Sequence, residues 1–260
     1  MDFINGKVSS KDLSYPIPFF SPPYEAPTGT MEWNGVSSII IRYRTDGELI
    51  RHLLPDNLTI ERNPIVTLMI IDYGPAPLGA CFEVFQMVEV LYNGKKFNFS
   101  ILLVLDNPRA VYIGRELFGF PKLLGEVEFK PLLADQTAEI RGHCISPLDN
   151  TTPALEYSFK PTTRLSSEAA SQFGGGGAPV LNLRLIPSSV PGAKPSVREF
   201  VEVDFHLEVG EVWEGDCEFK FPSTAESEPF HQLPVVERLS THLVRKCTSF
   251  VTLGEQAFRF

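Results

Sequence analysis

Residues 114–122 read GRELFGFPK, and this stretch indicates the fold and the chemistry more clearly than any other part of the 260-residue chain. It ends on Lys122, whose neighbours on both sides are aromatic, aliphatic, proline or glycine residues. A lysine amine attacks a carbonyl carbon only when it is neutral, and apolar surroundings favour the neutral form. Lys122 is therefore a candidate nucleophile for Schiff-base chemistry. The alternative is a lysine that emerges from an apolar collar and carries its charge to the surface.

Glu83 is the second candidate for the chemistry. It lies in a strand-like run, residues 80–91, where alternation places it on one face with Cys81, Phe85 and Met87. An acid on such an apolar face is expected to be buried and to need a partner. Buried acids are candidates for proton transfer. The alternative is a structural ion pair, for instance with Arg42, Arg44 or Arg115.

Strand patterns dominate the chain around these two residues. Asn93-Gly94 predicts a tight hairpin turn between two β-rich runs, which is the signature of a β-meander. Asp46 is placed to cap a short helix that Pro55 ends, and Gly210 predicts a bulge inside a long strand. Gly174 to Gly177 predict a flexible loop rather than a phosphate site. The predicted strands cover residues 37–43, 65–72, 80–91, 96–105, 126–130, 137–145, 180–185, 200–213 and 250–253.

The predicted fold is an α+β domain dominated by a bent, barrel-like antiparallel sheet, with the site inside it. Residues 1–35 are rich in proline, serine and aromatic residues, so we expect an extended arm laid on the body. Residues 36–260 are then one domain, because a chain of this size can bury a large core without staples.

Charge and composition exclude several classes of protein. The formal net charge is −9 and no run of basic residues exceeds two, which argues against nucleic-acid binding and against a polybasic membrane patch. The apolar runs are too short to span a bilayer, and the N-terminus does not resemble a signal peptide. Four scattered cysteines indicate buried thiols in a reducing compartment. We therefore expect a cytoplasmic protein, working as a homo-oligomer on a small molecule.

Metal and hydrolase chemistry find no support in the motifs. The five histidines show neither H-x-H nor H-E-x-x-H spacing, so no metal site is expected. No G-x-S-x-G segment is present, which leaves a hydrolase triad without its nucleophile elbow.

The lysine segment resembles that of the acetoacetate decarboxylases, whose pattern is G-R-E, a few residues, an aromatic residue and P-K. The likeness covers most of the chain, loosely after residue 130. It implies an acetoacetate decarboxylase-like fold, with Lys122 forming the Schiff base and Glu83 in the active site, and no added cofactor. Further pieces follow the family in order, namely YRTD at 43–46, LP at 54–55, Gly79 with Glu83, NG at 93–94, LDN at 105–107 and EVWEG at 211–215.

Three departures from the family pattern each replace a charge by an aliphatic group. Leu123 stands where the decarboxylases have a second lysine, Leu68 where they have another glutamate, and Val36 where they have an arginine. The resemblance places these three positions near the substrate, and Phe120 from the apolar collar and Arg115 are further candidates for substrate binding. The implied pocket is more apolar and poorer at holding a small carboxylate, so acetoacetate itself is not the expected substrate.

The expected function is a Schiff-base lyase acting on an apolar carbonyl compound, by aldol, dehydration, cyclisation or decarboxylation chemistry in secondary metabolism. Two alternatives remain at this point. One is a true β-keto-acid decarboxylase with a different carboxylate clamp. The other is a non-catalytic protein that binds apolar carbonyl ligands in the same pocket.

Overall fold

The computed structural model describes the whole chain except residues 1–3, 10, 12, 15, 76–77, 132–137, 149–150, 171–172, 174–176 and 227. The helices are α1 Gly47–Ile50, α2 Pro108–Glu116, α3 Ser167–Ala170 and the 3-10 turns η1 Arg51–Leu53 and η2 Phe230–Gln232. The strands are β1 Met31–Arg44, β2 Ile65–Asp72, β3 Phe82–Tyr92, β4 Lys95–Leu105, β5 Lys122–Leu124, β6 Glu126–Val127, β7 Lys130–Pro131, β8 Ile140–Ile145, β9 Leu155–Arg164, β10 Val180–Ile186, β11 Val197–Glu208, β12 Glu211–Lys220 and β13 Glu237–Arg259.

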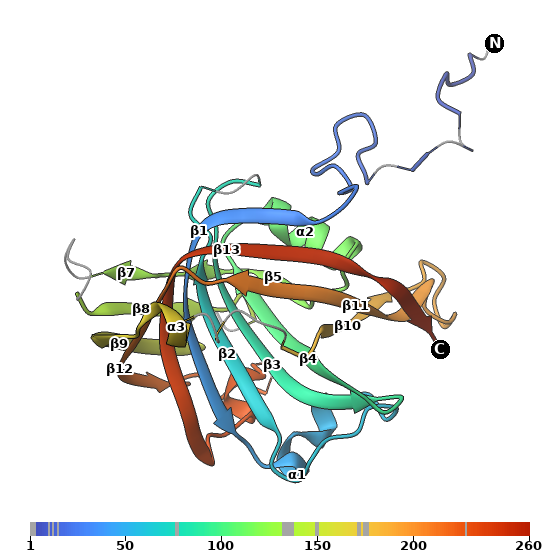
Figure 1. The fold of residues 1–260 in the computed structure, drawn as a ribbon. Helices are drawn as coiled ribbons and strands as arrows, with labels where there is room; N and C mark the ends of the chain where they lie inside the picture. Colours follow the sequence, from blue (N-terminus) through green and yellow to red (C-terminus); the bar gives the residue numbers. More distant parts are fainter. Residues whose placement is uncertain are drawn as a thin grey trace.

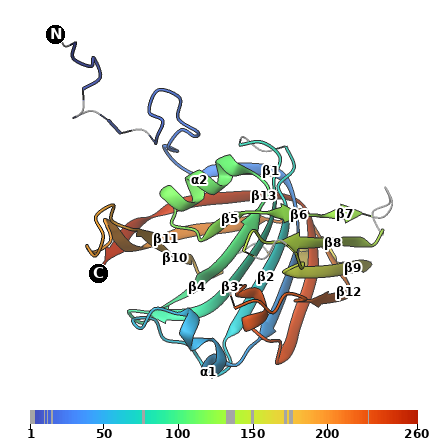
Figure 2. The same ribbon diagram turned by 180° about the vertical axis from the view of Figure 1, so that it is seen from behind.

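The described strands form one strongly bent sheet (Figure 1). Their order is β1-β2-β3-β4-β10-β11-β13-β12-β9-β8-β6, and β1 also pairs with β13, so the sheet turns back on itself. Most pairs are antiparallel, but β4 pairs in parallel with β5 and β10. The predicted α+β class with a bent sheet is confirmed, although the sheet is mixed and not a clean barrel. Figure 2 shows β6, β7, β8, β9 and β12 gathered at one side.

Local signals in the sequence account for several of these elements. Asn93 and Gly94 both have positive φ, at 50° and 78°, as the tight hairpin between β3 and β4 requires. The Asp46 side chain accepts a hydrogen bond from the Glu48 amide at 2.9 Å and so caps α1, as predicted. Helix α2 is not among the predicted elements, although Asn107 caps it and Pro108 begins it.

The long run predicted over residues 200–213 is interrupted at the expected glycine. Strand β11 ends at Glu208 and β12 begins at Glu211, and both pair with β13. A Cβ on Gly210 would lie 2.5 Å from the carbonyl oxygen of Lys246, so only glycine fits where these strands meet β13. The predicted Gly174–Gly177 loop falls mostly outside the described residues.

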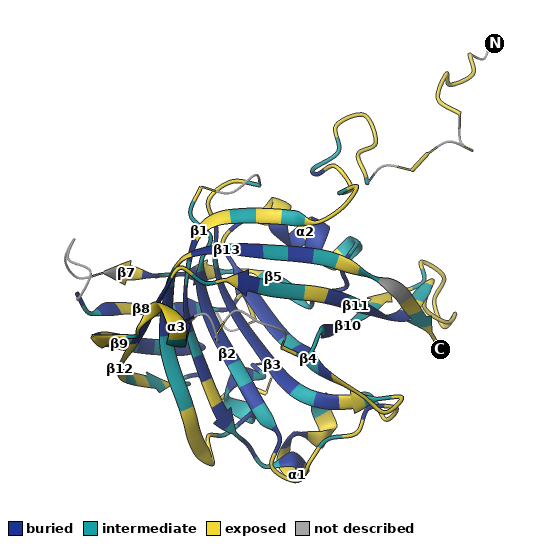
Figure 3. Ribbon diagram, in the orientation of Figure 1, coloured by how far each residue is buried: buried dark blue, intermediate teal, exposed yellow. Residues whose placement is uncertain are grey.

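Two apolar clusters occupy opposite faces of the sheet, because side chains alternate along each strand. The larger cluster contains Leu68, Ile70 and Val84, and the second contains Met69, Ile71 and Phe85. Figure 3 shows the buried residues concentrated along β1 to β4. The candidate site lies in the second cluster. No helix among the described residues is long and apolar enough to cross a membrane.

The segment before β1 contains no helix or strand among its described residues, and Figure 1 shows it running away from the body. Tyr24 is buried against the body, where its hydroxyl donates to Glu116 Oε2 at 2.8 Å. The Arg109 side chain donates to the carbonyl oxygen of Pro23 at 2.9 Å. Strand β1 begins at Met31, inside the predicted 1–35 arm, and the division into an arm and one domain stays a prediction.

Candidate active site

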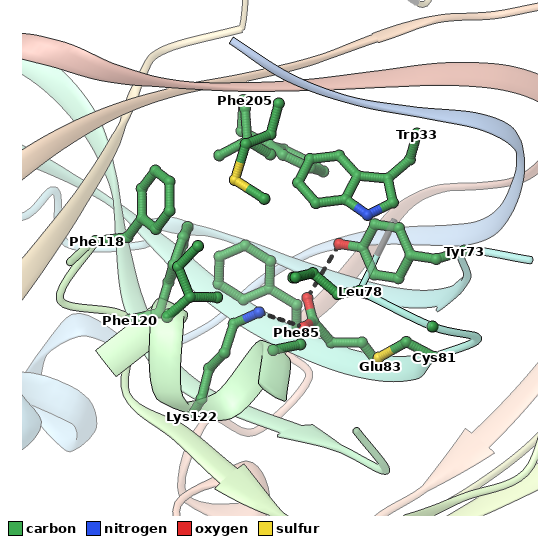
Figure 4. Close-up of a pocket in the computed structure, with 16 residues that line it drawn as sticks. Trp33, Tyr73, Leu78, Cys81, Glu83, Phe85, Phe118, Phe120, Lys122 and Phe205 are labelled. Atoms are coloured by element: carbon green, nitrogen blue, oxygen red, sulfur yellow. Dashed lines mark hydrogen bonds and ion pairs between the residues drawn. The ribbon is translucent and has the colours of Figure 1, made fainter. Parts of the chain in front are cut away.

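The candidate site is a cavity of about 60 Å³ that opens between β1, β3, α2 and β11 (Figure 4). Aromatic and aliphatic side chains form most of its wall. Lys122 and Glu83 are the charged groups among its described lining residues. The lining consists of Met31, Trp33, Tyr73, Leu78, Gly79, Cys81, Glu83, Phe85, Ala110, Ile113, Gly114, Phe118, Phe120, Lys122, Phe205 and Val251.

The backbone of Lys122 is fixed from two sides. Lys122 begins β5, which pairs in parallel with β4 so that Lys122 lies opposite Leu103. The guanidinium of Arg115 donates to the carbonyl oxygen of Lys122 at 3.0 Å. Arg115 is itself exposed and does not line the cavity. Arg115 therefore holds the backbone of Lys122 in position from outside the cavity.

The Lys122 side chain points into the cavity rather than to solvent (Figure 4). Its Nζ donates to Glu83 Oε2 at 2.8 Å, and the two side chains are 12% and 2% exposed. Nζ also lies 5.4 Å from the centre of the Phe120 ring. The alternative of a lysine that reaches the surface therefore does not describe this structure.

Glu83 projects from the centre of the sheet, where β3 lies between β2 and β4 and Glu83 pairs with Ile71 and Leu105. Its predicted face-mates Cys81 and Phe85 line the same cavity. None of the arginines considered as partners pairs with it: Arg42 pairs with Glu89, Arg44 with Glu237, and Arg115 with the Lys122 backbone. The ion-pair partner of Glu83 in the structure is the candidate nucleophile itself.

Two neutral groups complete the polar end of the cavity. The Tyr73 hydroxyl donates to Glu83 Oε1 at 3.2 Å. Burial, with the neighbouring Glu83 charge, raises the pKa of Tyr73 well above its usual value. Burial, and to a smaller extent the charge of Glu83, also raises the pKa of the Cys81 thiol. Both groups therefore keep their protons at any physiological pH, and Cys81 is a poor nucleophile.

Besides Arg115, three more of the predicted substrate-binding residues do not line the cavity. Leu68 is fully buried in the larger cluster on the opposite face of the sheet. Leu123 packs against that same cluster, because it follows Lys122 directly in a strand. Val36 is buried in the cavity-side cluster without reaching the lining. Phe120 does line the cavity, together with Phe118.

Tyr73, Trp33 and Phe205 line the cavity but were not predicted as site residues. Trp33 comes from β1 and Phe205 from β11, and Tyr73 follows directly after β2. Nothing in the local sequence of Trp33 or Phe205 distinguishes them from ordinary core aromatics. One signal was available for Tyr73, a tyrosine at the end of an apolar strand that runs beside the strand of Glu83.

The arrangement suits imine chemistry. A primary amine lies within hydrogen-bond reach of a carboxylate that can accept its proton, and the surrounding wall is apolar. Among the described residues, no three His, Cys, Asp or Glu side chains are grouped so as to hold a metal ion.

Comparison of the sequence with known proteins finds one family along nearly the whole chain. The family model described as acetoacetate decarboxylase matches residues 16–257. Decarboxylase DEC1 of Cochliobolus heterostrophus is 46% identical over 239 residues, which cover 91% of this chain and 92% of that protein.

Solved structures agree on the fold. A structure described as acetoacetate decarboxylase superposes with a TM-score of 0.77 at 23% identity, covering 97% of this chain and 98% of that chain. The enduracididine biosynthesis enzyme MppR, solved with the condensation product of pyruvate and imidazole 4-carboxaldehyde, superposes with a TM-score of 0.70 at 15% identity. That match covers 98% of this chain and 97% of the other.

Proposed function

Because the chain belongs to the acetoacetate decarboxylase family, we propose that it is a lyase that forms a Schiff base between Lys122 and a carbonyl substrate. The observation that supports this most directly is the 2.8 Å contact between Lys122 Nζ and Glu83 Oε2 inside an apolar cavity. The pair holds a nucleophile and a proton acceptor together where a carbonyl group can enter.

Glu83 acts as the proton shuttle in this proposal. It takes a proton from the Lys122 ammonium, and the free amine adds to the carbonyl carbon. The same carboxyl then passes two protons to the former carbonyl oxygen, the one it took and a second from the nitrogen, and that oxygen leaves as water. An ammonium and a ketone thereby become an iminium and water, with no net change in charge. The iminium withdraws electrons from the neighbouring carbon, where a bond can then break.

The substrate is expected to carry its carbonyl group next to an apolar chain. Six aromatic side chains face the cavity. Its volume of about 60 Å³ admits on the order of five non-hydrogen atoms if each occupies as much of it as one water molecule would. A longer tail would continue past Met31, Trp33 and Leu78, which are only partly buried. MppR, which holds a condensation product of two carbonyl compounds, supports a carbonyl substrate in this fold.

Decarboxylation of a β-keto acid is the second candidate reaction. It is favoured because the 46% identical relative, DEC1, is described as a decarboxylase. An apolar wall suits this reaction, because a carboxylate that leaves as neutral carbon dioxide loses its charge in the transition state. The imine on Lys122 would accept the electron pair that the carboxylate releases. The two candidates thus share the first half of the mechanism and differ in the bond that breaks.

Borohydride trapping with intact mass measurement tests the Schiff base. The protein is incubated with acetone, 2-butanone, 2-heptanone or acetoacetate, reduced, and weighed. We expect one adduct per chain, mapped by peptide analysis to Lys122, with a higher yield for 2-butanone than for acetone. Lys122→Arg should give none, because an arginine stays protonated and cannot form an imine.

Lys96→Arg is the matched control, because Lys96 is exposed and lies outside the cavity lining. It should trap the ketones as the unchanged protein does. An adduct that persists in Lys122→Arg would refute the Schiff base at this residue. Trapping without turnover of any β-keto acid or aldol donor would instead favour the non-catalytic binding protein.

A further inference from the structure

The carboxylate of Glu83 is held at both of its oxygens by different donors. Lys122 Nζ donates to Oε2 at 2.8 Å, and the Tyr73 hydroxyl donates to Oε1 at 3.2 Å (Figure 4). A carboxylate bound at one oxygen can still turn about its own axis, whereas binding at both oxygens fixes its plane. Oε2 is thereby kept facing Nζ.

Tyr73 is itself held in place. Its backbone amide donates to the carbonyl oxygen of Cys81 at 3.0 Å, which ties the residue after β2 to the start of β3. Its ring lies against Trp33, with 5.8 Å between ring centroids and 52° between ring planes. The hydroxyl therefore approaches Glu83 from a supported ring and not from a free side chain.

The lysine contact weakens once chemistry begins. The ammonium of Lys122 offers three N–H donors, but an iminium at the same nitrogen keeps only one. Glu83 then depends on its second donor to stay in position. Resting on the proposed imine at Lys122, we propose that Tyr73 is a positioning residue that holds the Glu83 carboxylate in place for proton transfer at the substrate carbon beside the imine.

The step balances without any further reactant. In the iminium of a simple ketone, the bond between the α-carbon and its hydrogen breaks, and the proton passes to Glu83 Oε2. The electron pair becomes a carbon–carbon double bond, and the iminium electrons move to nitrogen as a neutral enamine. Return of a proton from Glu83 reverses the step, and in deuterated water it returns a deuteron. The Tyr73 proton stays on its oxygen throughout.

The other groups around Glu83 are compatible with this role. Burial raises the pKa of Tyr73, so its hydroxyl remains a donor whether or not Lys122 is protonated. Cys81 is the remaining titratable side chain among the described lining residues, and its raised pKa keeps the thiol neutral. No second acid among these lining residues could replace Glu83.

The test measures imine formation and proton transfer separately, with 2-butanone as the probe. Borohydride trapping after equilibration gives the yield of imine at Lys122. Loss of the α-proton signals of 2-butanone in deuterated water, followed by NMR, gives the rate of proton transfer. Tyr73→Phe should leave the trapped yield within about twofold of the unchanged protein and slow exchange by about tenfold, the value of one charge-assisted hydrogen bond.

Two further variants decide between positioning and a merely structural role. Tyr112→Phe removes a hydroxyl from an exposed tyrosine on α2 and should change neither measurement. In a Glu83→Gln background, Tyr73→Phe should cause no additional slowing, because it acts through that carboxylate. Unchanged exchange in Tyr73→Phe, full additivity with Glu83→Gln, or loss of trapping in Tyr73→Phe would each overturn the inference. Failure of the unchanged protein to trap 2-butanone would instead count against the Schiff base.

Discussion

Gly114 and Lys122 lie so close that a side chain at position 114 would collide with the lysine. A Cβ built on Gly114 would be 2.5 Å from Lys122 Cδ and 2.9 Å from Cε. Gly114 lies in helix α2, where glycine is otherwise a poor choice, since it costs about 1 kcal/mol relative to alanine. Helix α2 therefore has a glycine at position 114, where the aliphatic part of the Lys122 side chain packs against the helix backbone.

Gly114→Ala is expected to displace the Lys122 side chain from Glu83 and to lower borohydride trapping of 2-butanone at least tenfold. A shift of about 1 Å in a reacting group can cost as much as a hundredfold in rate. Peptide mapping of the reduced adduct provides the measurement. Gly29→Ala is the control, because nothing lies within 4 Å of a Cβ at Gly29. Equal trapping by both variants would show that the Lys122 side chain can shift to make room for the Cβ and still form the imine.

Leu68→Ala should weaken the fold without changing the site. Leu68 is fully buried in the larger cluster, so its truncation leaves a cavity there and lowers the free energy of unfolding by about 2–5 kcal/mol. Urea unfolding measures that loss, and ketone trapping per folded molecule should stay unchanged. Phe120→Ala is the contrasting variant, because Phe120 lines the cavity and its loss should reduce trapping. A selective loss of ketone binding in Leu68→Ala would place Leu68 at the substrate after all.

Acetoacetate should be a poor substrate. Lys122 is the cation among the described lining residues, and its charge becomes the iminium that withdraws electrons, so no second described cation of the cavity is left to hold the carboxylate. Measurement of carbon dioxide release should give rates far below the usual enzymatic range of about 1–10³ per second. A β-keto acid with an apolar chain should react faster than acetoacetate. Rapid release from acetoacetate itself would contradict the apolar reading of the pocket.

Acid should destabilise the protein partly through Glu211. The Lys246 ammonium donates to Glu211 Oε1 at 2.5 Å and Arg164 lies 3.2 Å from the same oxygen, and the hydrogen bond from Lys246 is the main cause that lowers the pKa of Glu211. A carboxyl with a lowered folded-state pKa stabilises the fold above its unfolded pKa. That contribution disappears as the pH falls from about 5 through the folded-state value.

Urea unfolding at about pH 6 and about pH 3.5 checks this dependence. Glu211→Gln should lower stability at the higher pH and should lose less stability on acidification than the unchanged protein. Glu208→Gln changes an exposed glutamate nearby and should retain the original slope. Identical slopes in all three proteins would exclude Glu211 as a source of acid sensitivity.

Local sequence determined much of what lies close along the chain. Asn93-Gly94 specified the hairpin between β3 and β4, and Asp46 specified the start of α1, because each acts on its own backbone. Strand alternation correctly placed Glu83 on one face with Cys81 and Phe85, since side chains in a strand repeat every two residues. Helix α2 escaped prediction because its short apolar run, residues 110–113, carries too little periodicity to separate helix from strand.

The tertiary structure alone decided which side chains meet at Lys122. Tyr73, Trp33 and Phe205 come from segments far apart in sequence, and only the pairing of β1, β2, β3 and β11 within one bent sheet brings them together. Register also decided the place of Leu68, because neighbouring positions in a strand face opposite sides and a shift of one residue exchanges them. Local sequence thus singles out Lys122 and Glu83 as candidates, while the shape of the cavity around them depends on contacts across the whole sheet.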